Sequence, residues 1–533
     1  MKRGLFFIFF LGTLIAMITP VSQAGAAEFH VTNATELHDA LLTAQNNQQA
    51  DIIYLSAGTY PGNFSYVPPK SGDKSLTLTH EPGVRADEII VDGQNQESAF
   101  YLFDWTETGV SDVRINGMTV QNGNSPGHGG GINAMLACYN LSVTNCIIKN
   151  NRAQRYGGGL NLLTSLPGGG TITLENNLIL DNTVAELQGK SRGGGARMTC
   201  WYGNYIVTNN VIAWNSAEGT APQGGGLWIS WDSNNVAFLI HNTIYGNRAD
   251  TGGGVYFGDV GTANVYNNIL WGNIGAEGGD IYFGNVSNRV AYHNNYSDAS
   301  ALWTVSEDNL NTDPLFLDAV EGDFHLQPIS AMVNAGTSTV PDPPGLPLTD
   351  REGVPRTLGG APDIGAYESS QVNPWEGTIG TEITILGSQF GTKKGAALVG
   401  KVPLKVLEWS EGSARCLLSR KLSSGIYDIT LKPRGTPIVF TDAFIVQAPQ
   451  IDSIQPATGS AGEEIVIRGF FFGTTKGKVS LDRKNCKVVD WTMDKETGES
   501  VIQFVVPGGL TPWAHGLKVT NGMGSATAQF NLE

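Results

Sequence analysis

Positively charged residues are scarce in this sequence. There are 33 Lys and Arg against 49 Asp and Glu, which gives a formal charge of −16 at pH 7. Loss of Lys2 and Arg3 with the amino-terminal segment discussed below would make the charge −18. Such a charge repels nucleic acids and anionic membranes and keeps copies of a chain apart. We therefore expect a monomer with no nucleic-acid partner.

Cysteine is rare as well. The five present are Cys138, Cys146, Cys200, Cys416 and Cys486. No pair has the spacing of metal ligands, and the number is odd for an exported protein. We expect small buried side chains rather than a zinc site or a thiol enzyme, and no metal cofactor. One disulfide among the first three cysteines stays open.

Long hydrophobic runs are missing after the first residues. The chain begins with Lys2 and Arg3, an apolar run over residues 5–18 and small residues at 24–26. This pattern predicts a secretory signal peptide over residues 1–26. No later segment approaches the roughly 18 apolar residues of a membrane-spanning helix. The sequence predicts an exported protein, secreted or at the cell surface, without a membrane span.

Helical periodicity is missing from the middle of the chain, where glycine triplets recur instead. The triplets begin at Gly129, Gly157, Gly193, Gly224 and Gly252, with a degenerate copy at Gly278. The longest interval is the one from Gly157 to Gly193, and the shortest is the last. A second element, such as "NNLILDN", recurs in step with them and ends at Asn151, Asn182, Asn215, Asn247 and Asn273.

These repeats predict a solenoid. A unit of about 30 residues with short strands cannot bury its apolar side alone and must stack on its neighbours. Three short strands with turns complete one coil of a parallel β-helix. The recurring asparagines are expected to be structural, because asparagine suits turns with φ above zero and stacked amides can bond along the column.

Both ends of this region carry recognisable sequence. Asn33 precedes Glu36 by three positions, and apolar residues follow at helical spacing, so residues 33–45 predict a capped amphipathic helix that covers the open end. The segments "ELHDAL", "DIIYLSAGTY" and "VDG" resemble the amino-terminal coils of bacterial pectate-lyase-like β-helix proteins.

The blocks "DPLFLDAVEGDFHL", "DREGVPR" and "DIGAYE" (363–368) resemble the closing part of secreted bacterial right-handed β-helix proteins. Those proteins share repeats with chlamydial polymorphic-membrane-protein-like families. The resemblance implies a right-handed parallel β-helix over residues 27–369. It implies no single reaction, because the fold hosts lyases, hydrolases, esterases and adhesins.

A second duplication follows the solenoid. A proline and five glycines recur at one constant offset, which is the interval between Pro374 and Pro456, and Trp409 and Trp491 keep the same offset. The two copies, predicted over residues 370–448 and 449–533, have the strand and turn pattern of small β-sandwiches. They resemble IPT/TIG immunoglobulin-like domains, which implies a spacer or attachment role. The expected fold class is all-β: a right-handed parallel β-helix followed by two immunoglobulin-like β-sandwiches.

A Gly-His-Gly element at His128 raises the question of a pectin hydrolase. That family also needs an Asp-Asp pair and an upstream Asn-Thr-Asp element, because inverting hydrolysis uses spaced carboxylates as acid and base. The chain has no Asp-Asp pair, and its Asn-Thr-Asp begins far downstream at Asn311. We interpret His128 as an extra residue before a repeat turn.

A candidate binding face follows from alternation along the strands after the triplets. The first and third positions are mostly apolar and are predicted to face inward. The second positions are predicted to face outward: Asn133, Asn161, Arg197, Trp228, Tyr256 and Tyr282. In register, neighbours lie about 4.8 Å apart. We expect a flat aromatic strip of Trp228, Tyr256 and Tyr282, with Arg197 at one end and Trp231 nearby.

Three functions fit this face. Aromatic rings and polar neighbours suit binding of a polysaccharide or another surface polymer, with Arg197, Trp228, Trp231, Tyr256 and Tyr282 as ligand-binding residues. An alternative is a polysaccharide lyase or hydrolase, for which Arg197, Asp259 and Asp280 are the catalytic candidates and calcium the expected ion. The third is a structural adhesin, in which the rings only stack on one another.

Overall fold

The computed structural model describes residues 26–68, 75–104, 112–165, 170–186, 189–201, 203–341, 344–356, 361–369, 371–387, 390–494 and 498–533. The expected signal peptide, apart from Ala26, lies outside the described residues. In the part of the chain that the structure describes, no helix is long and apolar enough to cross a membrane.

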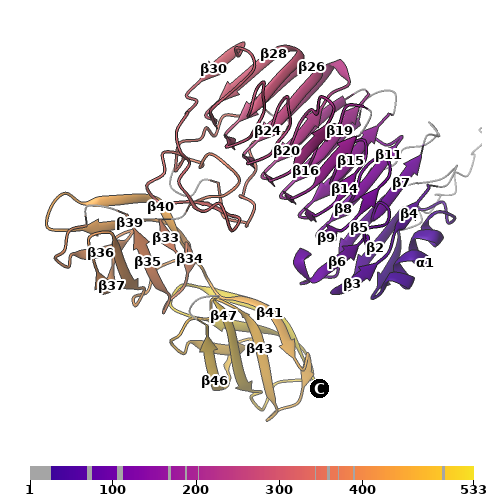
Figure 1. Ribbon diagram of the computed structural model, residues 1–533. Coiled ribbons are helices and arrows are strands. Elements are labelled where there is room, and N and C mark those ends of the chain that lie inside the picture. Colours follow the sequence, from indigo (N-terminus) through magenta and orange to yellow (C-terminus); the bar gives the residue numbers. More distant parts are fainter. Residues whose placement is uncertain are drawn as a thin grey trace, which may run out of the picture.

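The chain is almost entirely β, with a parallel β-helix followed by two smaller β modules (Figure 1). Strands from successive coils stack in parallel ladders. The first ladder contains β4 (Phe64–Tyr66), β7 (Phe100–Asp104), β11 (Ile132–Leu136), β15 (Leu160–Thr164), β19 (Ala196–Cys200), β23 (Leu227–Ile229) and the first parts of β26 (Val255–Tyr266) and β28 (Ile281–Tyr292). The second contains β1 (Ala27–Val31), β2 (Asp51–Leu55), β5 (Leu76–His80), β8 (Asp112–Asn116), β12 (Asn140–Thr144), β16 (Gly170–Glu175), β20 (Gly203–Thr208), β24 (Asp232–Ile240), the later parts of β26 and β28, and β30 (Val305–Glu307).

Two further ladders complete the coils. The third contains β3 (Gly58–Pro61), β6 (Ile89–Asp92), β9 (Thr119–Gln121), β13 (Ile147–Lys149), β17 (Leu178–Leu180), β21 (Val211–Ala213), β25 (Thr243–Tyr245), β27 (Ile269–Trp271) and β29 (Asn295–Tyr296). The fourth is short and contains β10 (Asn124–Ser125), β14 (Arg152–Ala153), β18 (Thr183–Glu186) and β22 (Ser216–Gly219). A 3-10 turn, η1 (Ala86–Glu88), precedes β6.

The sequence intervals between successive glycine triplets equal the intervals between paired residues in the first ladder. Ile132 pairs with Leu160, and the interval between them equals that from Gly129 to Gly157. Each of the four later steps along this ladder likewise equals the interval between the corresponding triplets. Side chains at the first and third positions of these strands are buried in the lumen, as expected. The predicted solenoid is therefore confirmed, and its coils stack in the predicted register.

Helix α1 (Ala34–Ala44) packs against β1 to β4 at the amino-terminal end (Figure 1). The Asn33 side chain accepts a hydrogen bond from Glu36 N at 3.0 Å, and Glu36 in turn accepts one from Thr32 N at 2.8 Å. The bond to Asn33 satisfies a backbone donor that the first helical turn leaves unpaired. The apolar residues predicted for the buried side are buried: Leu37, Ala40, Leu41 and Ala44.

Two buried asparagine columns run along the β-helix. In each, the Nδ2 of one amide donates to the Oδ1 of the next at 2.9 to 3.0 Å. The first column is the predicted one, from Asn151 to Asn273, and the second comprises Asn177, Asn210, Asn242, Asn268, Asn294 and Asn309. The expected positive φ was placed one position too late: it belongs to the preceding residues, such as Asp181 (53°) and Trp214 (57°).

The cysteines of the β-helix lie in its interior. Cys138, Cys146 and Cys200 are buried, as is Cys416 in the first β module, and Cys486 is half-buried. Cys138 and Cys146 are unpaired thiols, and burial raises their pKa to about 12 and about 11. Burial thus keeps these two thiols protonated and unreactive at neutral pH.

The segment after the last coil returns along the outside of the third ladder. Its hairpin, β31 (Phe316–Asp318) and β32 (Asp323–Leu326), and Tyr367 pack on Val211 and Ala213. The third ladder has apolar side chains on its outer surface as well as in the lumen, so this surface needs a cover. The fully buried Arg356 joins the two blocks recognised in the sequence: it donates to Glu368 Oε1 and to Asn209 Oδ1, both at 2.7 Å.

His325 makes the stability of this carboxyl-terminal segment of the β-helix dependent on pH. Its ring nitrogens lie 2.7 Å from Asp323 Oδ1 and 3.1 Å from Glu352 Oε2. Burial disfavours the charged ring, but the hydrogen bonds to Glu352 and Asp323 outweigh burial and raise the pKa from 6.5 to about 9. Because the folded pKa is the higher one, the stabilisation is complete below pH 6.5 and is lost as pH rises through about 9.

We expect His325→Gln to lower the urea midpoint most below pH 6.5 and least well above pH 9. The two proteins are compared by urea titration at several pH values. A difference in midpoint that is constant with pH would contradict this prediction.

The two β modules follow as tandem copies. Module 1 comprises β33 (Val372–Asn373), β34 (Glu376–Gly377), β35 (Glu382–Leu386), β36 (Ala396–Val399), β37 (Val402–Trp409), β38 (Ser413–Leu417), β39 (Gly425–Lys432) and β40 (Ile438–Val446). Module 2 comprises β41 (Gln450–Gln455), β42 (Thr458–Gly459), β43 (Glu464–Phe470), β44 (Lys478–Leu481), β45 (Lys484–Asn485), β46 (Lys487–Met493), β47 (Glu499–Val505), β48 (Trp513–Thr520) and β49 (Ser525–Leu532).

The duplication extends to side-chain hydrogen bonds. The indole of Trp409 donates to Gly391 O at 2.9 Å, and that of Trp491 donates to Gly473 O at 2.7 Å. The two donors and the two acceptors are each separated by the offset of the tandem copies. The predicted tandem sandwiches therefore share their internal geometry.

Candidate functional site

A second column of side chains lies beside the outward residues of the first ladder. It consists of the residues that precede the glycine triplets, which bridge in parallel from coil to coil: His128, Tyr156, Arg192, Gln223, Thr251 and Glu277. The interpretation of His128 as an extra residue was wrong, because His128 is the first member of this column. Its ring stacks on Tyr156 with centroids 4.8 Å apart, and burial lowers its pKa to about 4.

Two arginines cover Trp228. The guanidinium carbons of Arg192 and Arg197 lie 4.9 and 5.3 Å from the Trp228 ring centre, and 5.4 and 4.5 Å from that of Tyr156. Arg197 and Trp228 are only 6% and 5% exposed. Arg197 also donates to Asn161 Oδ1 at 2.9 Å. Both residues face away from the lumen as predicted, but they are buried under the second column and are not an open surface.

The aromatic strip has a different geometry from the one expected. The rings of Trp228 and Tyr256 are stacked, with centroids 6.2 Å apart and planes 7° apart. Tyr256 and Tyr282 stack at 5.0 Å and 11°. In-register strands bring identical positions so close that their rings pile face to face. Ring edges and hydroxyls, rather than flat faces, are therefore presented outward.

A groove opens beside these rings because the later coils have small residues where the earlier coils have large side chains. In the earlier coils, the fourth strand position carries Phe103, Met135 and Leu163. In the later coils, the equivalent track is Ser230, Gly258 and Gly284, and a cavity of about 360 Å³ lies over it. We call this cavity the axial groove. Its lining residues are Lys190, Arg192, Gln223, Trp228, Ser230, Trp231, Tyr256, Gly258, Asp259, Gly284 and Asn285.

Trp231 is the exposed aromatic of the axial groove. It is 47% exposed, and one face of its ring stacks on Trp201 with centroids 5.3 Å apart and planes 2° apart. The backbone hydrogen bond from Trp231 N to Asp259 O, 3.0 Å long, sets Trp231 in line with Asp259 and Asn285. Trp231 and the column of Trp228 and Tyr256 thus flank the track of small residues.

Polar groups surround these rings. The Asn285 amide donates to Asp259 Oδ1 at 3.1 Å, and both side chains are exposed. Lys190 and Arg192 stand on the side of the second column. The Tyr256 hydroxyl is hydrogen-bonded to Gln223, and burial raises its pKa. The axial groove therefore offers donors and acceptors suited to sugar hydroxyls beside apolar ring surface.

The candidates for a lyase do not form one site. Asp280 occupies the place of a third triplet glycine and is turned inward, where it accepts hydrogen bonds from Asn273 Nδ2 at 2.8 Å and Ser297 N at 2.7 Å. Burial, together with the charge of Arg192, lowers the pKa of Arg197 to about 10. Only Asp259 of the three lies in the axial groove. Among the described residues, no group of three or more His, Cys, Asp or Glu could hold a metal ion.

Four of the five binding residues predicted from the sequence lie at or beside the axial groove. Trp228, Trp231 and Tyr256 line the axial groove, and Tyr282 stacks on Tyr256. Arg197 lies beneath it, against Trp228. The analysis of alternation missed Lys190, Arg192, Gln223 and Asn285. Arg192 and Gln223 could have been found from their shared position before the glycine triplets.

Comparison with known proteins identifies the two modules. Residues 368–444 and 449–532 match the IPT/TIG domain family. Among curated proteins, none matches the chain. The chain spans less than half the length of the solved structures to which it is similar.

Three solved structures illustrate these similarities. The surface glycan-binding protein PbSGBP-B from Prevotella bryantii is 16% identical over 29% of this chain and 38% of its own, with a TM-score of 0.16. SGBP-B of the mixed-linkage glucan utilization locus of Bacteroides ovatus is 15% identical over 29% and 43%, with a TM-score of 0.16. A gamma-CGTase from alkalophilic Bacillus clarkii is 15% identical over 28% and 22%, with a TM-score of 0.14.

Proposed function

We propose that the protein binds a polysaccharide, or another surface polymer, in the axial groove of its β-helix. The observation that carries this proposal is the open track over Ser230, Gly258 and Gly284, flanked by the half-exposed Trp231 and the Tyr256 column. A track that follows the stacking direction of the coils suits a linear polymer. The protein is exported, and the two IPT/TIG modules serve as spacer or attachment at the cell surface.

The positions of the rings define how a sugar would bind. One face of Trp231 is stacked on Trp201, so its other face is the stacking surface for a sugar ring. The edge and hydroxyl of Tyr256, with Lys190, Asp259 and Asn285, bond hydroxyls of neighbouring sugars. Arg192 and Arg197 have a supporting role, because they fix Trp228 from behind.

Charge favours binding over uronate cleavage. Residues 27–369 contain 34 Asp and Glu against 14 Lys and Arg. A surface of this charge repels a polyuronate at long range. The dispersed positions of Arg197, Asp259 and Asp280 also lack the arrangement of base and clustered carboxylates that a calcium-dependent lyase uses.

We expect Trp231→Ala to weaken polysaccharide binding by about tenfold or more, because it removes the stacking face. Binding is measured by affinity electrophoresis and calorimetry over a panel of neutral and acidic polysaccharides. Tyr101→Ala is the matched control, since Tyr101 is 38% exposed on β7 of the same ladder but does not line the axial groove. Equal retardation of both variants would contradict the proposed site.

The same samples test the enzymatic alternative. Light scattering of the polymer with time, with calcium present, reports cleavage directly. We expect the mass of the bound polymer to stay constant. A falling mass that Asp259→Ala abolishes would replace binding with catalysis at this groove.

A further inference from the structure

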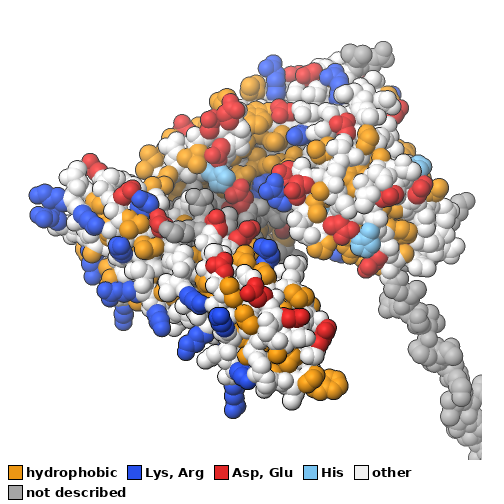
Figure 2. Space-filling model, turned by 90° about the horizontal axis from the view of Figure 1, so that it is seen from below, with side chains coloured by type: hydrophobic (Ala, Val, Ile, Leu, Met, Phe, Trp, Pro, Cys, Tyr) orange, Lys and Arg blue, Asp and Glu red, His pale blue; other side chains and the backbone are white. Residues whose placement is uncertain are grey.

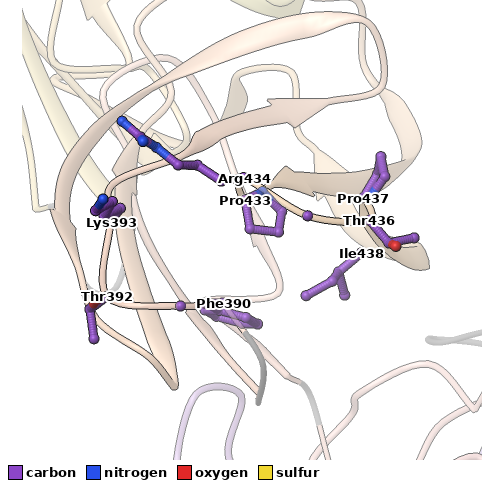
Figure 3. A pocket seen from close by; sticks show the side chains of 10 residues that line it. Phe390, Thr392, Lys393, Pro433, Arg434, Thr436, Pro437 and Ile438 are labelled. Carbon is purple, nitrogen blue, oxygen red and sulfur yellow. The ribbon is translucent and has the colours of Figure 1, made fainter.

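Module 1 has an open cavity of about 670 Å³ between two loops. Residues 390–393 form one side, and residues 433–438, which are the loop after β39 and the first residue of β40, form the other. Figure 3 shows Phe390, Pro433 and Ile438 turned toward the middle of the cavity, with Lys393 and Arg434 along one side. A Cβ atom added at Gly391 or Gly435 would meet no atom within 4 Å.

The equivalent face of module 2 is occupied by module 1. Gly473 is the counterpart of Gly391, and a Cβ added there would lie 2.7 Å from Ile379 Cγ2 of module 1. Thr474 N donates to Ile379 O at 3.1 Å, and Asn521 Nδ2 donates to Thr378 Oγ1 at 3.0 Å. In module 2, the face around Gly473 and Asn521 therefore binds a turn of module 1. We call this face, and the equivalent cavity of module 1, the seat.

The turn that occupies this seat is itself duplicated. In module 1, Thr381 N donates to Thr378 O at 3.1 Å and Gly380 N donates to Leu418 O at 2.8 Å. In module 2, Glu463 N donates to Ser460 O at 3.1 Å and Gly462 N donates to Val506 O at 3.0 Å. The two glycines have φ values of 97° and 93°. Module 2 thus carries the same turn at its far end.

The far end of module 2 exposes apolar surface. Trp513 is 82% exposed, and Ala461, at the apex of the turn, is exposed as well. The corresponding end of module 1 is covered, because Met523 of module 2 lies in the core cluster of module 1 and Ser424 N donates to its carbonyl at 3.2 Å. The pair of modules therefore has an unoccupied seat on module 1 and, at its opposite end, an exposed turn on module 2 that contacts no seat within the described part of the chain.

The charges of the two unused surfaces are complementary. On the seat, Lys393 replaces the Thr475 of module 2, and Arg434 replaces its Gly522. At the turn, Glu463 replaces the Thr381 of module 1, and Glu464 follows it. Figure 2 shows Lys and Arg side chains gathered over module 1, where residues 370–448 contain 9 Lys and Arg against 6 Asp and Glu. Opposite charges of this kind favour one orientation of docking.

The geometry points to head-to-tail association of two copies of this chain through their IPT/TIG modules. The turn Ser460 to Glu463 of one copy, with Trp513, seats in the cavity of module 1 of the next copy. This repeats between chains the contact that modules 1 and 2 make within a chain. Because the contact joins two different surfaces, a dimer still has one free seat and one free turn, so association continues beyond two copies and the modules form an open row. The inference goes beyond polymer binding and departs from the monomer that net charge alone predicts.

The test uses the full mature chain in analytical ultracentrifugation over a wide range of concentration. We expect the average mass of the wild type to rise past that of a dimer without a plateau. Gly435→Trp fills the seat at a position with open space and no left-handed φ. Ala461→Arg with Trp513→Ser removes the turn surface. Each variant alone is expected to stay monomeric.

A mixture of the two variants makes the test specific. The seat-blocked chain keeps its turn and the turn-blocked chain keeps its seat, so the mixture is expected to form one-to-one complexes and stop there. Leu302→Ser is the matched control, because Leu302 is 87% exposed on the β-helix, and it should associate like the wild type. A wild type that stays monomeric at all concentrations, a blocked variant that still associates, or a mixture that does not pair would overturn the proposal. Circular dichroism confirms that each variant is folded.

Discussion

Replacing Asn215 with Ala is expected to lower the free energy of unfolding of the central coils by about 4 kcal/mol. The amide of Asn215 donates to Ile179 O at 2.8 Å and to Asn247 Oδ1 at 2.9 Å, and it accepts from Asn182 N at 3.0 Å. Asn215 is only 1% exposed. Alanine leaves these buried groups without partners, and each such group costs about 1 to 3 kcal/mol.

The measurement is hydrogen exchange of the native protein, because a solenoid loses coils locally and a single unfolding midpoint can hide this. Protection of the coils around β17 and β21 should fall in Asn215→Ala. The matched control is Asn288→Ala, whose exposed amide makes one hydrogen bond, to Thr262 Oγ1 at 3.3 Å. If both variants lose protection equally, the asparagine column does not stabilise the fold as described.

Gly194→Ala is expected to be at least as damaging, by about 4 kcal/mol or more, or to prevent the central coils from folding. The added methyl group would lie 2.3 Å from Gly225 O and 2.5 Å from the carbonyl carbon of Ser216. Both are backbone atoms of the neighbouring coil, so no flexible side chain can give way. The coils would have to separate and lose ladder hydrogen bonds.

The control for Gly194→Ala is Gly435→Ala in module 1. Its new methyl group meets nothing within 4 Å, and the expected change in stability is within about 0.5 kcal/mol. Hydrogen exchange compares the two variants, read in the central coils for Gly194→Ala and in module 1 for Gly435→Ala. A Gly194→Ala protein as stable as wild type would show that the coils are less closely packed than the structure indicates.

Much of the fold could be predicted because the repeats record the stacking register. The step from Ile132 to Leu160 equals the spacing of the corresponding glycine triplets. The lid helix was predictable from Asn33 and Glu36, and the tandem modules from their constant offset. In each case, the sequence pattern is itself the cause of the structure.

The candidate site was predicted less well, for physical reasons. Alternation indicates on which side of a sheet Trp228 and Arg197 lie, but it does not indicate what packs over them, and here Arg192 and Tyr156 do. The flat aromatic strip was wrong because in-register rings stack on each other. Asp280 was misplaced because a carboxylate in the place of a glycine can turn inward toward Asn273.

The axial groove exists because the later coils lack large side chains at the fourth strand position. Gly258 and Gly284 end the motifs "GGGVYFG" and "GGDIYFG", where earlier coils carry Met135 and Leu163. A comparison of the fourth strand position across the coils would have shown this loss. Lys190 is three positions ahead of its glycine triplet, and no repeated feature distinguishes it.

The most direct measurement of polymer binding in the axial groove is hydroxyl-radical footprinting with and without a polysaccharide that the protein retains. Both samples have the same protein concentration. We expect labelling of Trp231 to fall when the polymer is bound, while Trp513, the exposed tryptophan of module 2, is labelled equally in both. Unchanged labelling of Trp231 by a polymer that binds would contradict this site and place the polymer elsewhere on the protein.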